Sequence, residues 1–168
     1  MILEDSPDVW GYTIFCDDIR AEVGGKLTYV GTYAGRLFVH ADFPVILPKL
    51  ALGIVYAQRI GAVVLPVQFQ IYIPGDADDK PALVIEVPNE ISEAAIRDAA
   101  AFSETVGAER GFSTVIAPVT LAPFQLTQPG LFRVRAVRGD RLIRLGSMEV
   151  LRAPQPANPA TSDLKSGH

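Results

Sequence analysis

Short runs in which apolar and polar residues alternate recur along the whole chain, and this period-two pattern limits the fold more than any other feature. Such alternation is typical of β-strands that bury one face. Turns that contain glycine or proline separate the runs. The predicted strands cover residues 10–16, 27–33, 37–40, 50–57, 63–73, 83–87, 112–121, 131–137 and 142–151. Strands this short, at intervals of about ten residues, predict an all-β domain.

The first two runs, residues 10–16 and 27–33, flank a polar connection that contains two consecutive glycines, Gly24 and Gly25. Glycine adopts positive φ at no steric cost, so the two runs are predicted to pair as an antiparallel hairpin. One set of alternating residues in the first run defines the face that we expect to be buried: Trp10, Tyr12, Ile14 and Cys16.

The run at residues 50–57 is apolar on both faces, which predicts a strand in the middle of the structure. Its second face carries small residues, and a large side chain such as Trp10 or Phe15 is expected to pack there. The next run, at 63–73, has one clearly apolar face, formed by Val63, Leu65, Val67, Phe69, Ile71 and Ile73. Residues 90–106 change to alanine and charged residues at helical spacing, so one helix is expected there.

These elements predict a two-sheet antiparallel β-sandwich, immunoglobulin-like or related, with the one helix in a crossover. A small barrel is the alternative arrangement. The cysteine pair of immunoglobulins is absent, because Cys16 is the single cysteine of the chain. The expected organisation is an acidic N-terminal arm at 1–9, a sandwich domain at 10–152 and a proline- and alanine-rich tail at 153–168.

The composition predicts a globular chain without a membrane span. A chain of 168 residues can bury a core as one domain. Hydrophobic residues make up 49% of the sequence, yet no uninterrupted apolar run reaches the roughly 18 residues of a membrane span. The net charge of −4 argues against nucleic acid as a partner. The acidic start, MILEDSPDVW, and the single cysteine predict a cytoplasmic location.

Three strings near the start, FCDDIR, EVGGK and YVGTYAG, and one near the end, QPGLFRVRAVRGDRLIRLGSMEVL, carry a resemblance to a known family. The chain resembles an uncharacterised family of small bacterial proteins, also found in some phages, that opens with the same Cys-Asp-Asp and Gly-Lys hairpin. The final string is similar to that family's closing pattern of two strands and two turns. The resemblance spans residues 12–151 and implies a β-sandwich. It implies no catalytic residue, because none is assigned to the family.

No motif for hydrolysis, phosphate binding or dinucleotide binding occurs in the chain, so no catalytic residue and no cofactor are predicted. Cys16 shares a strand face with apolar residues and is expected to be inert core packing. Two acidic clusters offer oxygen ligands for a calcium ion, and capping of turns is the alternative use of such aspartates. The first cluster contains Asp17, Asp18 and Glu22, and the second contains Asp76, Asp78 and Asp79.

Positive charge is concentrated near the end of the predicted domain. Residues 133–152 contain six arginines and two carboxylates, a net charge of +4, so the rest of the chain carries −8 to give the total of −4. The arginines are Arg133, Arg135, Arg138, Arg141, Arg144 and Arg152. The first two alternate with apolar residues and are expected on the outer face of a strand.

Arginine forms bidentate pairs with carboxylates, so this segment is predicted to meet an acidic protein surface or another copy of the chain. The predicted partner-binding residues are Arg133, Arg135, Arg138, Arg141 and Arg144. A solvated surface whose charges discourage aggregation is the alternative. The sequence therefore predicts a non-catalytic protein-binding or assembly module. A sandwich that binds a small ligand or a metal, and a metal-assisted hydrolase that uses acidic loop residues, stay open as alternatives.

Overall fold

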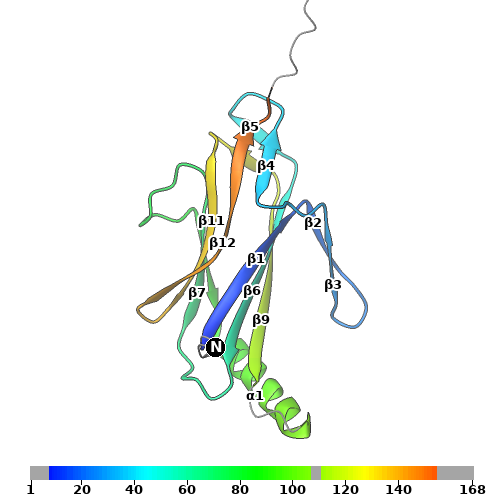
Figure 1. The fold of residues 1–168 in the computed structure, drawn as a ribbon, viewed down its shortest axis with the longest axis vertical. Coiled ribbons are helices and arrows are strands. Elements are labelled where there is room, and N and C mark those ends of the chain that lie inside the picture. The colour runs from blue at the N-terminus through cyan, green and yellow to red at the C-terminus, as the bar shows by residue number, and fades with distance from the viewer. Residues whose placement is uncertain (1–7, 107–110, 155–168) are drawn as a thin grey trace, which may run out of the picture.

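The computed structural model describes residues 8–106 and 111–154, which form strands of three to twelve residues and one helix (Figure 1). In chain order the elements are β1 (Val9–Cys16), β2 (Asp18–Ala21), β3 (Leu27–Val30), β4 (Arg36–Val39), β5 (Val45–Leu47), β6 (Leu50–Arg59), β7 (Val67–Tyr72), β8 (Leu83–Val87), α1 (Asn89–Val106), β9 (Phe112–Leu121), β10 (Phe124–Leu126), β11 (Gly130–Arg138) and β12 (Arg141–Arg152). The helix predicted at 90–106 is confirmed, since α1 begins one residue earlier and ends at the same residue.

Backbone pairing arranges the strands in two larger sheets and two short pairs. The larger sheets have the orders β1-β6-β9 and β4-β12-β11-β7-β8, while β2 pairs with β3 and β10 with β5. The ladder between β12 and β4 is parallel, which corrects the expectation of a purely antiparallel fold. Parallel neighbours need a long connection, and most of the chain lies between these two strands. Helix α1 joins β8 of one larger sheet to β9 of the other, so the expected crossover is confirmed.

The core lies between the two larger sheets. Phe15 and Tyr56 come from the three-stranded sheet, and Phe69 and Phe132 come from the five-stranded sheet. The ring centroids are 5.7 Å apart for Phe15 and Phe132 and 6.2 Å apart for Tyr56 and Phe69. Both pairs meet edge to face, an arrangement that aromatic rings prefer. The fold is therefore mostly β and sandwich-like, as predicted.

β6 is the central strand that its two apolar faces predict. It pairs with β1 on one side and β9 on the other, and it is buried along nearly its whole length. On the face turned away from the core, the ring of Tyr29 occupies the space that a Cβ at Gly53 would need. Tyr29 of β3 is thus the large side chain over Gly53, and the expectation of Phe15 on this face is wrong, because Phe15 lies in the core. Trp10 does lie on this face, opposite Ala57, but it comes from the neighbouring strand of the same sheet and not from the opposite layer.

The partner and the faces of β1 both differ from the prediction. β1 pairs with β6, and the hairpin is formed by two four-residue strands, β2 and β3. Trp10 and Tyr12 are 40% and 45% exposed, whereas Val9 and Phe15 are buried in the core. Alternation separates the two faces of a strand without saying which one meets the core, and large aromatic residues are not always inside.

β7 is shorter than predicted. It begins at Val67, and Val63 lies before it with 71% of its surface exposed. Pro66 precedes the strand, and proline cannot donate a hydrogen bond to a ladder. Val67, Phe69 and Ile71 are buried, which confirms the inner face expected for this part of the run.

The predicted arm and tail lie mostly outside the described residues, since 1–7 and 155–168 are not described. Ala153, the first residue of the predicted tail, is still buried on the domain, and its N–H donates to the carbonyl oxygen of Val39 over 2.8 Å. No helix within residues 8–106 and 111–154 is long and apolar enough to cross a membrane.

Candidate functional site

Two of the candidate arginines meet the second acidic cluster on the outer face of the five-stranded sheet. Arg133 and Arg135 lie on β11, on the face opposite Phe132, as the alternation predicts. Nη2 of Arg135 is 2.7 Å from Oδ1 of Asp78, and Arg133 pairs with the same oxygen. Both guanidinium groups also lie over the ring of Tyr72, 4.8 Å and 4.7 Å from its centroid. We call Arg133, Arg135, Asp78 and Tyr72 the arginine–aspartate cluster.

The arginine–aspartate cluster leaves little of its positive charge available to a partner. The side chains of Arg133 and Arg135 are 20% and 15% exposed. The loop that carries Asp78 covers them, and Nη2 of Arg133 also donates to the carbonyl oxygen of Asp76 over 2.7 Å. Arg135 and, to a smaller extent, Arg133 lower the pKa of the Asp78 carboxyl from its usual value. The ionised carboxylate of Asp78 therefore serves as the counter-charge for both arginines.

Replacing Asp78 with asparagine is expected to lower the melting temperature at neutral pH, and the difference from the unmodified protein should vanish in acid. The lowered pKa means that the ionised carboxylate stabilises the folded state above the ordinary pKa of aspartate. That contribution is lost as the pH falls through the lowered pKa of the folded state, below about pH 4. Melting curves of both proteins between neutral pH and about pH 3 measure this. The control is Asp79→Asn, and an equal pH profile in that variant would count against the pairing.

The other members of the acidic clusters include residues that serve in turns. Oδ2 of Asp76 accepts a hydrogen bond from the backbone N–H of Ile73 over 2.9 Å and so caps the turn after β7. Asp79 is exposed, and Glu22 lies at the turn of the β2–β3 hairpin, where its N–H donates to the carbonyl oxygen of Lys26 over 2.8 Å. In the described part of the chain, no group of three or more His, Cys, Asp or Glu residues is placed to hold a metal ion. The metal hypothesis gains no support from this geometry.

Asp17 and Asp18, in the string FCDDIR, anchor the β2–β3 hairpin to the rest of the domain. The hydroxyl of Tyr33 donates to Asp17, and Asp18 pairs with Lys49. Burial first, and then the hydrogen bond to Asp17, raise the pKa of Tyr33, so its hydroxyl stays protonated. Cys16 is fully buried, its Sγ lies 3.3 Å from the carbonyl oxygen of Asp18, and burial raises the pKa of its thiol. A protonated, enclosed thiol is what inert core packing requires.

Arg138 does not lie on the outer face with the other candidate arginines. It is 7% exposed, and its Nη2 donates to the carbonyl oxygen of Val63. Within the described residues its Nε has no hydrogen-bond partner. The sequence holds a signal for this placement, because Arg138 continues the alternation of Phe132, Val134 and Ala136, all of which are buried. Arg138 is therefore part of the interior and not of a contact strip.

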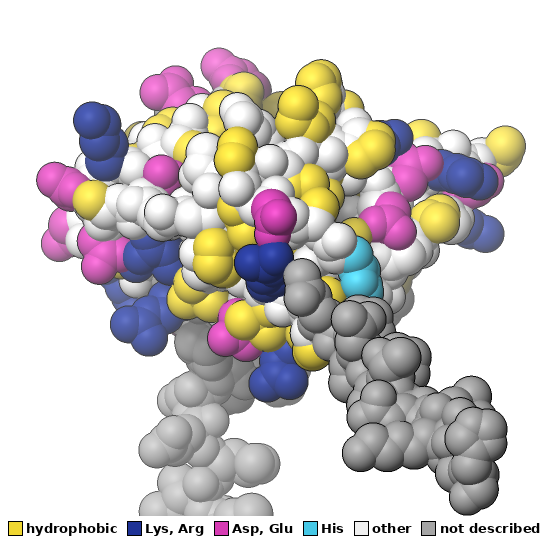
Figure 2. Space-filling view, turned by 90° about the horizontal axis from the view of Figure 1, so that it is seen from above, with side chains coloured by type: hydrophobic (Ala, Val, Ile, Leu, Met, Phe, Trp, Pro, Cys, Tyr) yellow, Lys and Arg dark blue, Asp and Glu magenta, His cyan; other side chains and the backbone are white. Residues whose placement is uncertain are grey.

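Arg141 and Arg144 are exposed on β12 and carry what remains of the predicted contact strip. Arg152, at the end of the same strand, pairs with Asp42. Figure 2 shows positive and negative side chains beside one another at one end of the molecule, which fits charges that are balanced locally. An acidic partner for this segment stays a prediction that rests on two side chains.

The outer face of the three-stranded sheet presents aromatic side chains that the sequence analysis placed inside. Trp10 and Tyr12 of β1 stack with ring centroids 6.1 Å apart and ring planes inclined by 18°. Trp10 also meets Phe112 of β9 edge to face, with centroids 6.3 Å apart. Ile116 lies on the same face of β9 and is 50% exposed. We call Trp10, Tyr12, Phe112 and Ile116 the aromatic patch.

Known proteins offer no guide to what these surfaces do. No protein-family model, curated protein or solved structure matches this chain. The arrangement of its own side chains is therefore the basis for a functional proposal.

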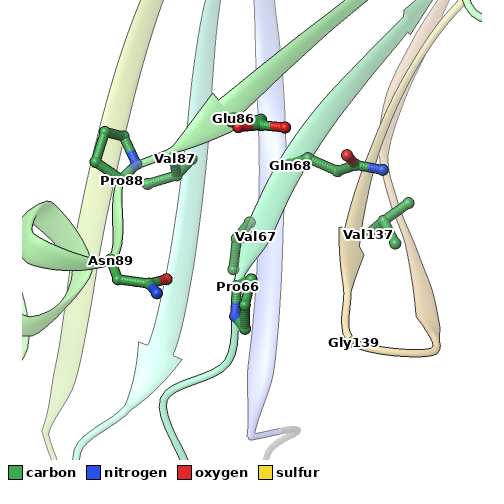
Figure 3. Close-up of a pocket in the computed structure, with 9 residues that line it drawn as sticks. All are labelled: Pro66, Val67, Gln68, Glu86, Val87, Pro88, Asn89, Val137 and Gly139. Carbon is green, nitrogen blue, oxygen red and sulfur yellow. The ribbon is translucent and has the colours of Figure 1, made fainter.

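A hollow of about 590 Å³ lies where β7, β8 and the start of α1 come together (Figure 3). Gln68 of β7 and Glu86 of β8 are opposite one another in the ladder, and both line it. Asn89, the first residue of α1, and Gly139, in the turn after β11, lie at its sides. None of the residues that line the hollow is positively charged. The sequence analysis missed this feature, because it depends on how distant segments meet.

Proposed function

We propose that the protein is a non-catalytic binding module that holds a partner protein against the aromatic patch. The observation that carries the proposal is the exposed stack of Trp10 and Tyr12 on a strand whose neighbour, β6, is almost completely buried. Tryptophan and tyrosine dominate the binding energy of many interfaces, because they offer large contact areas with few rotatable bonds. Single exposed apolar residues are ordinary on protein surfaces, whereas a cluster of them marks an interaction site.

The occupant that we propose is an apolar surface of another protein. No member of the aromatic patch carries a charge, and the residues opposite Trp10 and Tyr12 on β6 are the apolar Ala57 and Val55. Arg59, which lies opposite Phe112 on the same face, is already paired with Asp8, so charged and polar ligands would lose water here and gain few partners for their own groups. An apolar protein surface has no hydrogen bonds to water to lose, and its contact with the aromatic patch removes apolar area from water, which is favourable.

The reactive groups of the domain support binding rather than catalysis. A nucleophile or general base needs a free group with a suitable pKa. The thiol of Cys16 is buried with a raised pKa. Asp17, Asp18 and Asp78 are each engaged by a tyrosine, a lysine or a pair of arginines. These contacts stabilise the fold and leave the carboxylates poorly suited to proton transfer.

Replacing Trp10 and Tyr12 together with serine is expected to reduce capture of the partner by about tenfold or more, because both anchors of the contact are removed. The measurement is an affinity pull-down from the native organism with quantitative mass spectrometry. The matched control replaces Leu131 and Leu142, which are 47% and 54% exposed on the five-stranded sheet, with serine. Melting curves establish that both variants stay folded.

The same pull-down separates the proposal from its competitors. A third variant, Arg141→Glu with Arg144→Glu, reports on the predicted acidic partner. If that variant alone loses the captured protein, the aromatic patch is not the binding surface. Size exclusion with light scattering tests the remaining occupant, a second copy of the chain, which would make the wild type dimeric and the serine variant monomeric.

The proposal includes an immunoglobulin-like topology for the sandwich. In immunoglobulin variable domains, A, B and E share one sheet, and G, F, C and C′ are neighbours in the other. The orders β1-β6-β9 and β12-β11-β7-β8 follow the same sequence of strands, with β4 added beside β12 and α1 in the connection from β8 to β9. The disulfide has no counterpart here, because the chain has a single cysteine. An experimental structure with another strand order would contradict this assignment.

A further inference from the structure

β8 is an edge strand that contains no lysine, arginine or proline, although Pro81 and Pro88 flank it. An unpaired edge presents backbone N–H and C=O groups to any extended chain, and proteins block such edges with charged residues, most often lysine, with proline or with a covering element. β4 carries Arg36, β9 carries Pro118 and packs against α1, and β1 runs beside β12. β8 reads LVIEV, and its Leu83 and Val84 are 37% and 45% exposed. Among the described residues β8 pairs with β7 alone.

The hollow described above lies over β7 and β8, the two strands at this end of the sheet. Glu86 and Val87 of β8 line it, and Figure 3 shows the Glu86 side chain between β8 and β7. Within residues 8–106 and 111–154 Glu86 takes part in no ion pair. A strand added to β8 would lie about 4.8 Å away, with every second side chain on the face that carries Glu86. A long basic side chain at such a position is expected to reach across β8 to the carboxylate of Glu86.

We propose that the free edge of β8 binds an extended segment of another protein as an added strand, and that a lysine or arginine of that segment enters the hollow and pairs with Glu86. In this mode of recognition, main-chain hydrogen bonds give affinity and pockets for alternate side chains give specificity. The amide groups of Gln68 and Asn89 offer further acceptors to a basic side chain. This surface is separate from the aromatic patch, which lies on the other larger sheet.

Charge favours a foreign segment over occupants from the same chain. In an antiparallel pair of two β8 strands centred on Ile85, each Glu86 would lie diagonally across from the other, within reach of a long side chain, and the two carboxylates would have no basic residue of β8 between them. The sequence of residues 1–7, MILEDSP, has two carboxylates and no basic residue. Residues 155–168 contain one lysine, Lys165, and for that reason their peptide is one of the probes below.

The test uses a phage-displayed library of random peptides of about nine residues, the length of a long strand. The library is selected on the full chain and counter-selected on Val84→Lys, a variant whose new positive charge lies on the exposed face of β8 that also carries Glu86. We expect enriched peptides that alternate apolar and polar residues around one lysine or arginine. Their affinity should fall by about tenfold or more on Val84→Lys.

A second variant isolates the ion pair. Glu86→Gln keeps the size of the side chain and is expected to weaken an enriched lysine peptide by about two- to fivefold. The same peptide with norleucine in place of lysine should bind both proteins equally. Backbone amide shifts on binding should centre on residues 83–87, and the Trp10 and Tyr12 serine variant should bind the peptides unchanged.

Several results would overturn the proposal. They are the absence of enrichment on the wild type over Val84→Lys, enriched peptides without a basic residue, equal binding of the lysine peptide to Glu86→Gln, and amide shifts that centre elsewhere. Binding of the 155–168 peptide with the same dependence on Val84 and Glu86 would identify the tail as the occupant and reject a foreign segment. Amide spectra of the free variants confirm that each is folded before it is compared.

Discussion

Replacing Phe132 with alanine is expected to lower the free energy of unfolding by about 3–5 kcal/mol, the range found when a buried phenylalanine is truncated. Phe132 has no exposed surface, and it joins three parts of the core. Its ring meets Phe15 from the other larger sheet at 5.7 Å and Phe124 of β10 at 5.9 Å, both edge to face. Alanine removes both contacts and leaves a cavity that rigid strands on either side cannot close. Urea unfolding monitored by circular dichroism measures the loss.

The neighbouring residue supplies the control for this prediction. Leu131 directly precedes Phe132 in β11, but its side chain points to the other face of the sheet and is 47% exposed. Leu131→Ala should change the free energy of unfolding by no more than about 0.5 kcal/mol, as surface substitutions usually do. A similar loss in both variants would mean that the two sheets do not pack through this face of β11.

Replacing Gly11 with alanine is expected to cost about 2–3 kcal/mol, because the new methyl group has no space that the surroundings can yield. A Cβ at Gly11 would collide with the carbonyl oxygen of Val55, which belongs to the paired strand β6, and would lie 2.7 Å from Cδ2 of Leu145. Leu145 can change rotamer, but a carbonyl within a central strand cannot move without breaking its ladder. Truncating Leu145 to alanine should therefore fail to rescue Gly11→Ala.

Gly53→Ala provides the matched comparison on the same pair of strands. The obstacle there is the ring of Tyr29, whose Oη would be 2.8 Å from the new Cβ. A ring at the end of a side chain can be removed, so Tyr29→Ala should recover most of the stability that Gly53→Ala loses. The double-mutant cycle gives the coupling directly. Rescue at Gly11 by Leu145→Ala, or none at Gly53 by Tyr29→Ala, would contradict the packing described here.

The features that the sequence predicts well are those that leave a local trace. β6 is apolar on both faces and is central, α1 follows helical spacing, and Arg133 and Arg135 lie opposite Phe132 as their alternation indicates. In each case the neighbours within one or two turns or pleats determine which face is buried. Arg138 carries the same kind of trace, and its inward placement follows from the phase of β11.

The features that the sequence does not predict depend on partners far along the chain. Nothing within β1 indicates that it pairs with β6 rather than with the run that follows it. Arg133 and Asp78 are 55 residues apart, so two candidate sites that look independent turn out to neutralise one another. Trp10 is exposed because the opposite face of β1 meets the core, and a residue's size does not determine that choice.

The burial of β6 along nearly its whole length also matters during synthesis of the chain. Residues 50–58 contain no charge and no proline, a composition that promotes aggregation whenever the segment is unpaired. β6 ends at residue 59 and its second partner β9 ends at residue 121, 62 residues later. At a synthesis rate of about 5–20 residues per second, one edge of β6 therefore has no partner strand for roughly 3–12 s. Lys49 and Arg59 flank the segment, so we expect the cations that pair with Asp18 and Asp8 in the folded protein to oppose self-association of the nascent chain as well.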